Sequence, residues 1–456
     1  MNQRMQLKTI FKTLLLVSIA IGFGTTFHAS DWHKDKLKQY FDQLIKHDKA
    51  NLSLSILKDD EVIYQRTIGQ LSEAGENANP DSLYRIGSIT KMYTATIIMQ
   101  LIEAGKLSLD TPLSKFYYKV KNSPKITIKH LLSHSSGIHN FTDMPEYQDY
   151  MTEPKTKQEM LTIIYNMASD YEPGSQASYS NSNYLLLGFI IEMLDKSSYA
   201  ESLQNRILIP LKLKQTVYGS KIDVDKNQAA SMMFQQGRWQ NMPETDMTIP
   251  HAAGAIVATS ADVAKFVQAL FSGMLVSEDS LDKMMDIQNG YGLGVLRLPF
   301  YDRFAYGHTG GIDGFSTITG HFPQENMTFA MHSNAMKMNL NDVTVTLLSA
   351  YFKRSFEMPD FNIKTVYLSP PELEVFAGNY GSKALPIDIT LFVEDQTLFA
   401  QGSGQAPFPL TAINKQHFRF EKAGIEIEFN DKRADSQAVQ FVMRQGGGSF
   451  PFVRKD

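Results

Sequence analysis

The chain has 456 residues, of which 43% are hydrophobic and 20% are charged, and these proportions are ordinary for a globular protein of two or three domains. Lysine and arginine number 44 against 48 aspartates and glutamates, and no strongly basic block occurs, which argues against nucleic acid as a main partner. Cysteine is absent from the sequence, and this excludes disulfides, thiolate catalysis and zinc sites with cysteine ligands.

The N-terminus has the pattern of a signal peptide. Three basic residues precede an apolar run over residues 13–24, and small and polar residues follow it up to Ala29. A short basic segment, a short apolar segment and a cleavage zone are typical of secretion signals. The pattern predicts a signal peptide over 1–29 and an exported, periplasmic or otherwise extracytoplasmic protein. The alternative is an uncleaved segment that anchors the protein to a membrane.

Four stretches predict secondary structure, taken in chain order. Residues 51–69 alternate apolar and polar side chains around a polar turn, which indicates a β-hairpin. Residues 95–110 have the apolar spacing of a helix that a glycine ends, and residues 258–273 begin with Thr259 three positions before an aspartate, as helices often do. Residues 314–334 predict a second hairpin. Two hairpins around a helical middle predict an α+β fold, with an antiparallel sheet built from both ends and a helical subdomain.

The character of the sequence changes near residue 370. From 33 to 365, strand-like and helical stretches are mixed, whereas from 370 to 456 only short alternating runs occur, such as "IDITLFV" and "IEIEF". These features predict one mixed domain over 33–365 and a separate, small all-β domain over 370–456, which we expect to be a barrel.

The spacing Ser-x-x-Lys, which can place a nucleophile beside a base, occurs three times: Ser55/Lys58, Ser88/Lys91 and Ser280/Lys283. The first pair lies in a predicted strand, where residues three apart point to opposite faces and cannot meet. In the last pair, Ser280 has the place of a helix cap and Lys283 that of a surface charge. Only Ser88 starts an apolar helix, where residue i+3 shares its face and a buried lysine can lose its proton.

Two further segments offer partners for a serine nucleophile. In "YEPGSQASYSNSNYLLLG", Tyr179 precedes an apolar helix and could donate a proton to a leaving group. The alternative is a turn tyrosine followed by Asn181 or Ser182 as the helix cap. In "GHTGGIDGF", the triplet 308–310 offers a histidine, a hydroxyl and a glycine on an expected edge strand, and the alternative is an exposed histidine at a glycine-rich strand end.

Taken together, three motifs resemble those of the serine β-lactamase and D-Ala-D-Ala carboxypeptidase superfamily, in its class C-like branch: Ser88-x-x-Lys91, Tyr179-Ser180-Asn181 and His308-Thr309-Gly310. The stretches "LLSHSSGI", "AAGAIVATSADVAKF" and "YGLG" are also similar to that branch. The resemblance covers residues 33–355 and implies a β-lactamase/transpeptidase-like fold. The C-terminal domain resembles the lipocalin-like domain that some members carry.

The resemblance implies a role for each motif residue. Ser88 attacks an acyl carbonyl, while Lys91 and Tyr179 act as a coupled pair that takes up its proton and passes one to the leaving group. The backbone N–H groups of Ser88 and Gly311 form the oxyanion hole. Neither a cofactor nor a metal is needed, and the small-molecule or peptide substrate lies against the remaining motif residues: Asn181, His308, Thr309, Gly310 and Gly311.

The histidine of the third motif bears on the substrate. The resemblance implies that β-lactamases of this branch usually carry lysine there, whereas several D-specific peptidases carry histidine. We expect His308 to change its charge between about pH 5 and 8 and to attract a substrate carboxylate when it is protonated. The sequence therefore predicts an exported serine hydrolase, in first place a D-stereospecific peptidase or carboxypeptidase that acts on D-amino-acid peptides.

Other functions with the same fold stay open on the sequence. They are an esterase, a weak β-lactamase and a non-catalytic penicillin-binding or scaffold protein, with small esters or β-lactams as ligands. The residues name neither the natural substrate nor the oligomeric state.

Overall fold

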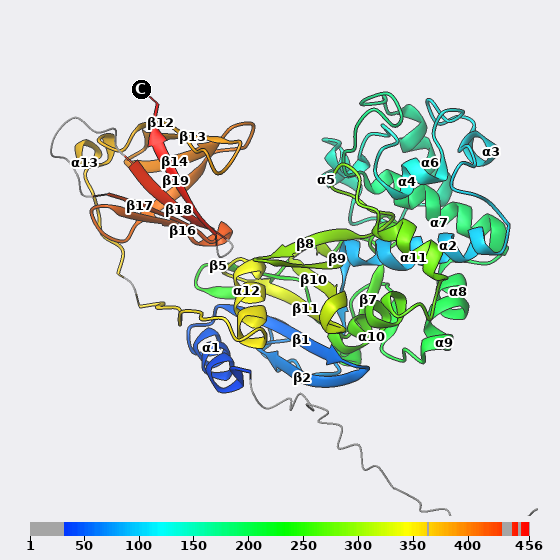
Figure 1. Cartoon of the computed structure of the whole chain (residues 1–456), viewed down its shortest axis with the longest axis horizontal. Helices are drawn as coiled ribbons and strands as arrows, with labels where there is room; N and C mark the ends of the chain where they lie inside the picture. The colour runs from blue at the N-terminus through cyan, green and yellow to red at the C-terminus, as the bar shows by residue number, and fades with distance from the viewer. Residues whose placement is uncertain (1–31, 363, 431–439, 446–447, 456) are drawn as a thin grey trace, which may run out of the picture.

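The computed structural model describes residues 32–362, 364–430, 440–445 and 448–455 (Figure 1). The predicted signal peptide over 1–29 lies outside these residues. Within the described ranges, no helix combines the length and the apolar character that crossing a membrane requires.

An antiparallel, six-stranded sheet forms the centre of the larger domain (Figure 1). In spatial order its strands are β2 (Glu61–Ile68), β1 (Ala50–Lys58), β11 (Met327–Met336), β10 (Phe315–Phe322), β9 (Arg303–Ile312) and β8 (Leu296–Phe300). Both predicted hairpins are present, as β1–β2 and β10–β11, and they join through β1 and β11. The sheet is thus built from segments far apart in the chain, and the predicted α+β fold is confirmed.

Most helices of this domain lie between β2 and β8 in the chain and form a helical region beside the sheet (Figure 1). The helices are α1 (Lys34–Lys46), α2 (Thr90–Glu103), α3 (Ser114–Tyr117), α4 (Ile128–Leu132), α5 (Tyr147–Tyr150), α6 (Lys157–Asn166), α7 (Asn181–Asp195), α8 (Tyr199–Leu203), α9 (Ile209–Leu211), α10 (Ser260–Phe271), α11 (Glu278–Met285) and α12 (Leu340–Tyr351). The predicted helices over 95–110 and 258–273 correspond to α2 and α10, and Thr259 caps α10 as expected.

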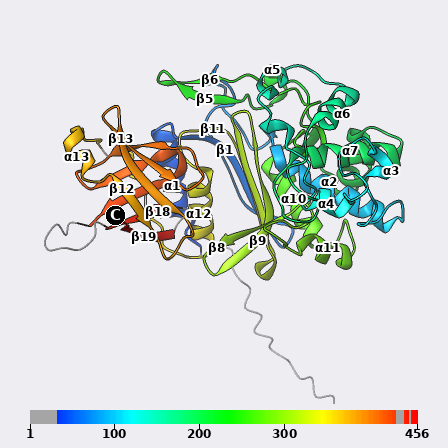
Figure 2. The same cartoon turned by 90° about the horizontal axis from the view of Figure 1, so that it is seen from above.

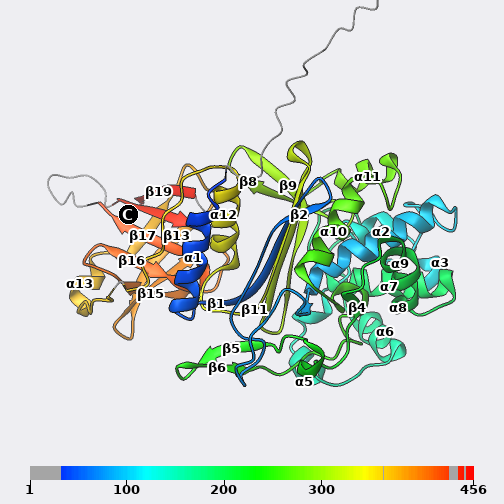
Figure 3. The same ribbon diagram turned by 90° about the horizontal axis from the view of Figure 1, so that it is seen from below.

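Helices cover both faces of the sheet, so β1 is buried on both sides (Figure 3). On one face, Leu52 and Leu54 of β1 pack in the same core as residues of α1 and α12. On the other face lies α10, where the hydroxyl of Ser55 hydrogen-bonds that of Ser260 at 2.8 Å. The alternation of leucine and serine along β1 follows these two environments, because successive side chains of a strand point to opposite faces.

The last residues of β9 form an open edge of the sheet. β8 pairs with β9 only from Arg303 to Gly307, so residues 308–312 have a partner strand on one side alone. The edge position expected for the third motif is confirmed. Two small sheets complete the domain, one of β3 (Tyr84–Arg85), β7 (Ile256–Ala258) and β4 (Thr216–Tyr218), the other of β5 (Met232–Gln235) and β6 (Arg238–Asn241).

The C-terminal strands close into a barrel, as predicted (Figure 2). Large side chains fill its interior, and among them Tyr380, Phe429 and Phe441 contact one another ring to ring. The described interior is therefore a packed core and not an open cup. The elements are α13 (Pro370–Glu374), β12 (Gly378–Gly381), β13 (Asp388–Glu394), β14 (Thr397–Gly402), β15 (Phe408–Ala412), β16 (His417–Phe420), β17 (Ile425–Phe429), β18 (Gln440–Gln445) and β19 (Gly448–Arg454).

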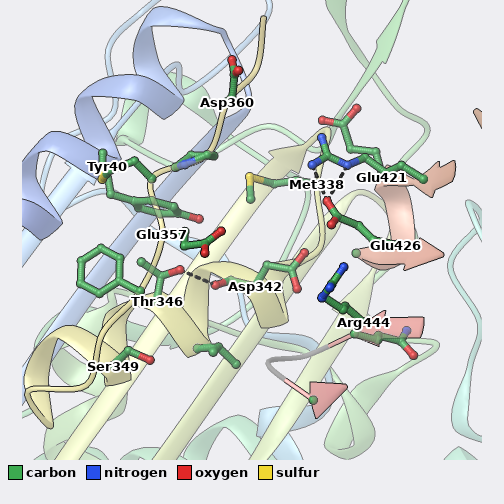
Figure 4. A pocket seen from close by; sticks show the side chains of 18 of the residues that line it. Tyr40, Met338, Asp342, Thr346, Ser349, Glu357, Asp360, Glu421, Glu426 and Arg444 are labelled. Atoms are coloured by element: carbon green, nitrogen blue, oxygen red, sulfur yellow. Dashed lines mark hydrogen bonds and ion pairs between the residues drawn. The ribbon is translucent and has the colours of Figure 1, made fainter. Parts of the chain in front are cut away.

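The two domains meet beside α12, around a pocket of about 590 Å³ (Figure 4). Lys49 of the larger domain forms an ion pair with Glu421 of the barrel at 2.5 Å. Burial and the nearby carboxylate of Glu426 raise the pKa of Asp342 to about 6. A hydrogen bond from His417 contributes most to lowering the pKa of Glu426 to about 2. Charged side chains of both domains thus meet at this pocket, beside apolar side chains such as Met338 and Phe361.

Candidate active site

Ser88 lies directly before α2, in the 3₁₀ turn η1 (Gly87–Ile89). The sequence predicted a helix start at Ser88, and the structure inserts this one tighter turn before the α-helix. Gly87 has a φ of +52°, in the left-handed region, and a Cβ atom on it would come within 2.9 Å of the backbone nitrogen of Gly311. Glycine at this position permits both the turn and the close approach of β9.

Lys91 lies on the same face as Ser88, and its side chain is buried. Its Nζ lies 3.0 Å from the Oγ of Ser88, 2.7 Å from the Oδ1 of Asn181 and 2.8 Å from the carbonyl oxygen of Ala253. Burial lowers the pKa of Lys91 well below its ordinary value. A neutral amine has two N–H donors and one lone pair. Asn181 and Ala253 accept two hydrogen bonds from Lys91, so in its neutral form Lys91 would direct its lone pair at the hydroxyl of Ser88.

Tyr179 approaches the same oxygen from a second segment. Its hydroxyl donates a hydrogen bond to the Oγ of Ser88 at 2.5 Å. Burial raises the pKa of Tyr179 above the ordinary value of a phenol, so the group is neutral and can donate. The N-cap position of α7 is occupied by Ser180, not by Asn181 or Ser182. Ser88 therefore has a proton acceptor and a proton donor within hydrogen-bond distance.

Asn181 holds the side chain of Lys91 in place. Its Oδ1 accepts from Lys91, its Nδ2 donates to the hydroxyl of Thr142 at 3.2 Å, and its backbone N–H donates to the Oδ1 of Asn140 at 2.9 Å. These contacts fix the side chain of Asn181 and direct it toward Lys91. Its role in holding a substrate amide, which the resemblance implies, stays a prediction.

The two segments that carry the expected oxyanion donors touch each other. A Cβ atom on Gly310 would lie 2.1 Å from the carbonyl oxygen of Ile86 and 3.1 Å from the backbone nitrogen of Ser88. β9 therefore runs against η1 at a distance that only a glycine allows. The N–H groups of Ser88 and Gly311 lie on these facing segments, where an oxyanion hole needs two donors. Their role stays a prediction.

His308 differs most from the expectation. It is 3% exposed, and its Nδ1 lies 2.5 Å from the carbonyl oxygen of Thr309, so this nitrogen carries the proton. Burial, with a smaller contribution from Lys91, lowers the pKa of His308 to about 4. The expectation that it changes its charge between about pH 5 and 8 is wrong, because burial removes the water that stabilises an imidazolium. His308 is a neutral group at neutral pH.

The burial of His308 leads to a testable prediction about the pH dependence of KM. The charge of His308 changes only as the pH falls through about 4. The KM of a carboxylate-bearing peptide is therefore expected to follow the same pH profile, between about pH 5 and 8, in the wild type and in His308→Asn. Steady-state kinetics at half-unit pH steps check this. A bend in the wild-type profile that His308→Asn loses would show that His308 titrates in this range.

His134 is a site residue that the sequence reasoning missed. Its ring lies 4.5 Å from that of Tyr179, and its Nδ1 accepts a hydrogen bond from the backbone N–H of Ser180 at 3.1 Å. Burial lowers the pKa of His134 well below its ordinary value, so the imidazole is neutral. It supports the segment that carries Tyr179. The signal available in the sequence was the histidine within the polar stretch "LLSHSSGI". In the structure, the backbone of this residue has a φ of +56°, in the left-handed region.

The two competing Ser-x-x-Lys pairs do not form such a site. Ser55 and Lys58 lie on β1 and bind different partners, as expected for side chains that cannot meet: Ser55 is buried against α10, and Lys58 donates to the carbonyl oxygen of Glu325. Lys283 forms an ion pair with an aspartate one turn away, which confirms the surface charge. The cap of α11 is Ser277, whose hydroxyl accepts from the N–H of Ser280, so the assignment of Ser280 as the cap was wrong.

Ser88 opens into a cleft of about 630 Å³. Beside the motif residues, the turn over 289–291 and Leu296 line it. The lining residues carry no charge at neutral pH, because His308 is neutral and Lys91 lies buried behind Ser88. In the part of the chain that the structure describes, no group of histidines and carboxylates could hold a metal ion.

A serine hydroxyl between a buried lysine of lowered pKa and a neutral tyrosine, at the edge of an antiparallel sheet, is the arrangement of a serine hydrolase. Residues 37–350 match the family described as Beta-lactamase, and the chain belongs to this family. The resemblance read from the three motifs is thus confirmed.

Known proteins are similar to this chain in sequence or in fold. The chain is 24% identical to the teichoic acid D-alanine hydrolase of Staphylococcus aureus (strain NCTC 8325 / PS 47) over 275 residues, which are 60% of this chain and 66% of that protein. The D-stereospecific amidohydrolase from Streptomyces sp. matches with 25% identity and a TM-score of 0.58, over 66% of this chain and 94% of that one. The octameric penicillin-binding protein homologue from Pyrococcus abyssi matches with 24% identity and a TM-score of 0.65, over 92% of this chain and 100% of that one. Against three other curated relatives, the chain spans 40% to 65% of their own length.

Proposed function

We propose that this protein hydrolyses amides and esters of D-amino acids through an acyl-enzyme on Ser88. The leaving group of these substrates carries no charge. The lining of the cleft carries the proposal, because no described residue in it is charged at neutral pH. A carboxypeptidase must bind the free carboxylate of its substrate, and a carboxylate that leaves water without a cationic partner is strongly disfavoured. A substrate residue that is internal or capped has no free carboxylate and presents only uncharged polar groups, which hydroxyls and backbone N–H groups of the protein can bind.

The names of two relatives support the substrate class. One is a D-stereospecific amidohydrolase and the other a teichoic acid D-alanine hydrolase, so both names point to D-amino acids. The pattern of residues 1–29 supports export, which is part of the proposal.

The contacts of Ser88 supply each step of acyl transfer. Its Oγ attacks the carbonyl carbon, while the Lys91–Tyr179 pair takes up its proton and Tyr179 donates one to the leaving nitrogen or oxygen. The N–H groups of Ser88 and Gly311 stabilise the oxyanion. Water then attacks the acyl-enzyme, the pair takes up its proton, and the returned proton restores the hydroxyl of Ser88.

Two substrates with one scissile bond test the proposal. N-acetyl-D-alanyl-D-alanine and its C-terminal amide differ only in the charge at the end of the leaving group. We expect kcat/KM, measured as release of N-acetyl-D-alanine, to be at least about tenfold higher for the amide, because an unpaired carboxylate must be desolvated. The L-alanyl forms serve as the control for stereospecificity and are expected to react more slowly.

A variant with an added cation tests the opposite change in substrate preference. In His308→Lys, an ammonium group replaces the neutral imidazole at the cleft, and the preference is expected to shift toward the free carboxylate. A wild-type enzyme that prefers the free carboxylate would overturn the proposal and restore the carboxypeptidase assignment.

A further inference from the structure

Arg85 is a buried cation near the nucleophile that the proposed mechanism does not use. It lies on β3, three residues before Ser88, and its side chain is 2% exposed. The guanidinium donates to the carboxylates of Asp313 at 2.9 Å and Glu244 at 2.8 Å, and to two backbone carbonyl oxygens. The fork of a guanidinium can hold several acceptors in fixed directions. Arg85 thus joins three separate segments of the chain.

Asp313 is the partner that belongs to the oxyanion strand. It lies in the tight turn between β9 and β10, with a φ of +51° and a side chain that is fully buried. One of its oxygens accepts from Arg85, and the other accepts from the backbone N–H of Thr245 at 3.1 Å and from its hydroxyl at 2.6 Å. A solvated Asp-Gly turn is sufficient to join two strands. The buried carboxylate does more, because it ties the tip of the hairpin to Arg85.

The same ion pair links the two segments that carry the expected oxyanion donors. Asp313 follows Gly311 by two residues, and Arg85 precedes Ser88 by three. Between these anchor points the segments touch, since a Cβ atom on Gly310 would lie 3.1 Å from the backbone nitrogen of Ser88. We propose that Arg85 and Asp313 are positioning residues that hold the N–H groups of Ser88 and Gly311 at the spacing an oxyanion requires. This inference rests on the acyl-transfer function proposed above.

The effect should appear in the transition state and not in substrate binding. Hydrogen bonds to an oxyanion strengthen as the negative charge develops, so their loss lowers kcat and leaves KM nearly unchanged. Loss of one donor costs about 10²–10³ in kcat, and a displacement of about 1 Å has an effect of similar size.

Asp313→Asn tests the inference with a nearly isosteric change. Its carbonyl oxygen can still accept from Thr245, while the charge that holds Arg85 is lost. We expect kcat to fall about 10²-fold, with KM within about threefold of the wild type. The affinity for a boronic acid analogue of the tetrahedral intermediate should fall by the same factor as kcat/KM.

Glu244→Gln is the matched control, because Glu244 binds the same guanidinium but lies outside the β9–β10 hairpin. We expect its kcat to stay within about threefold of the wild type. Equal losses of kcat in both variants, or a loss of thermal stability in Asp313→Asn with kcat retained, would show that the ion pair is only structural. If Asp313→Asn does not fold, Arg85→Lys keeps the positive charge but loses the fork that binds Asp313 and Glu244 together, and an unchanged kcat in that variant would overturn the inference. Turnover that survives in Ser88→Ala would instead contradict the proposed function.

Discussion

Replacing Ser88 by alanine is expected to lower kcat by at least about four orders of magnitude, because no acyl-enzyme can form without its hydroxyl. The Oγ of Ser88 lies within hydrogen-bond distance of both Lys91 and Tyr179. In the wild type, a fluorophosphonate or a labelled penicillin should form an adduct with the peptide that contains Ser88, as determined by mass spectrometry after proteolysis. In Ser88→Ala, no adduct should form.

Ser280→Ala is the matched control for this prediction. Ser280 has the same Ser-x-x-Lys spacing, but Lys283 is engaged by an exposed aspartate and lies outside the cleft. We expect turnover within a few-fold of the wild type, because a substitution away from the reacting atoms leaves the site intact. An adduct on Ser280, or on any serine other than Ser88, would contradict the assignment of the nucleophile.

Removal of the amine of Lys91 should have the second largest effect. Lys91→Met keeps an unbranched apolar stem and is expected to lower kcat about 10³–10⁴-fold, which is the contribution of a positioned general base. The wild-type kcat/KM should fall as the pH falls through the lowered pKa of Lys91, because only the neutral amine can take up the proton. This limb of the pH profile should be absent from the residual activity of Lys91→Met.

Two further variants separate the base from the charge. Lys91→Arg keeps a cation that does not deprotonate, so it should be about as inactive as Lys91→Met if the neutral amine is the base. Lys283→Met, at the exposed match, should retain full activity. A Lys91→Arg variant with near wild-type turnover would show that Lys91 acts through its positive charge, and Tyr179 would then be the base.

Local patterns in the chain were sufficient for the elements that form the sheet. The alternation over 51–69 and 314–334 predicted both hairpins, and the cap at Thr259 predicted the start of α10. These predictions succeeded because the period of burial along a strand or a helix is written in neighbouring residues. The closed barrel followed in the same way from short alternating strands.

The choice of Ser88 over Ser55 and Ser280 was also within reach of the sequence. An i, i+3 pair can meet on a helix but not on a strand, and this distinction needs no tertiary contact. The resemblance carried by the three motifs then implied that their residues form one site. The structure brings them to one cleft except Lys91, which lies buried behind Ser88, and Ser180, which is the N-cap of α7.

The sequence by itself was sufficient to predict Ser88 as the nucleophile, to predict the helix that follows it and to give the order of the motifs, while the tertiary structure decided the charge of the site. Whether the ring of His308 is neutral or positively charged depends on its exposure to water, and this exposure is set by segments far from it in the chain. Distant segments also set the direction of Asn181 toward Lys91 and the pairing of Arg85 with Asp313, which lie 228 residues apart. Burial and long-range partners fix pKa values and side-chain directions, and a local pattern does not contain them.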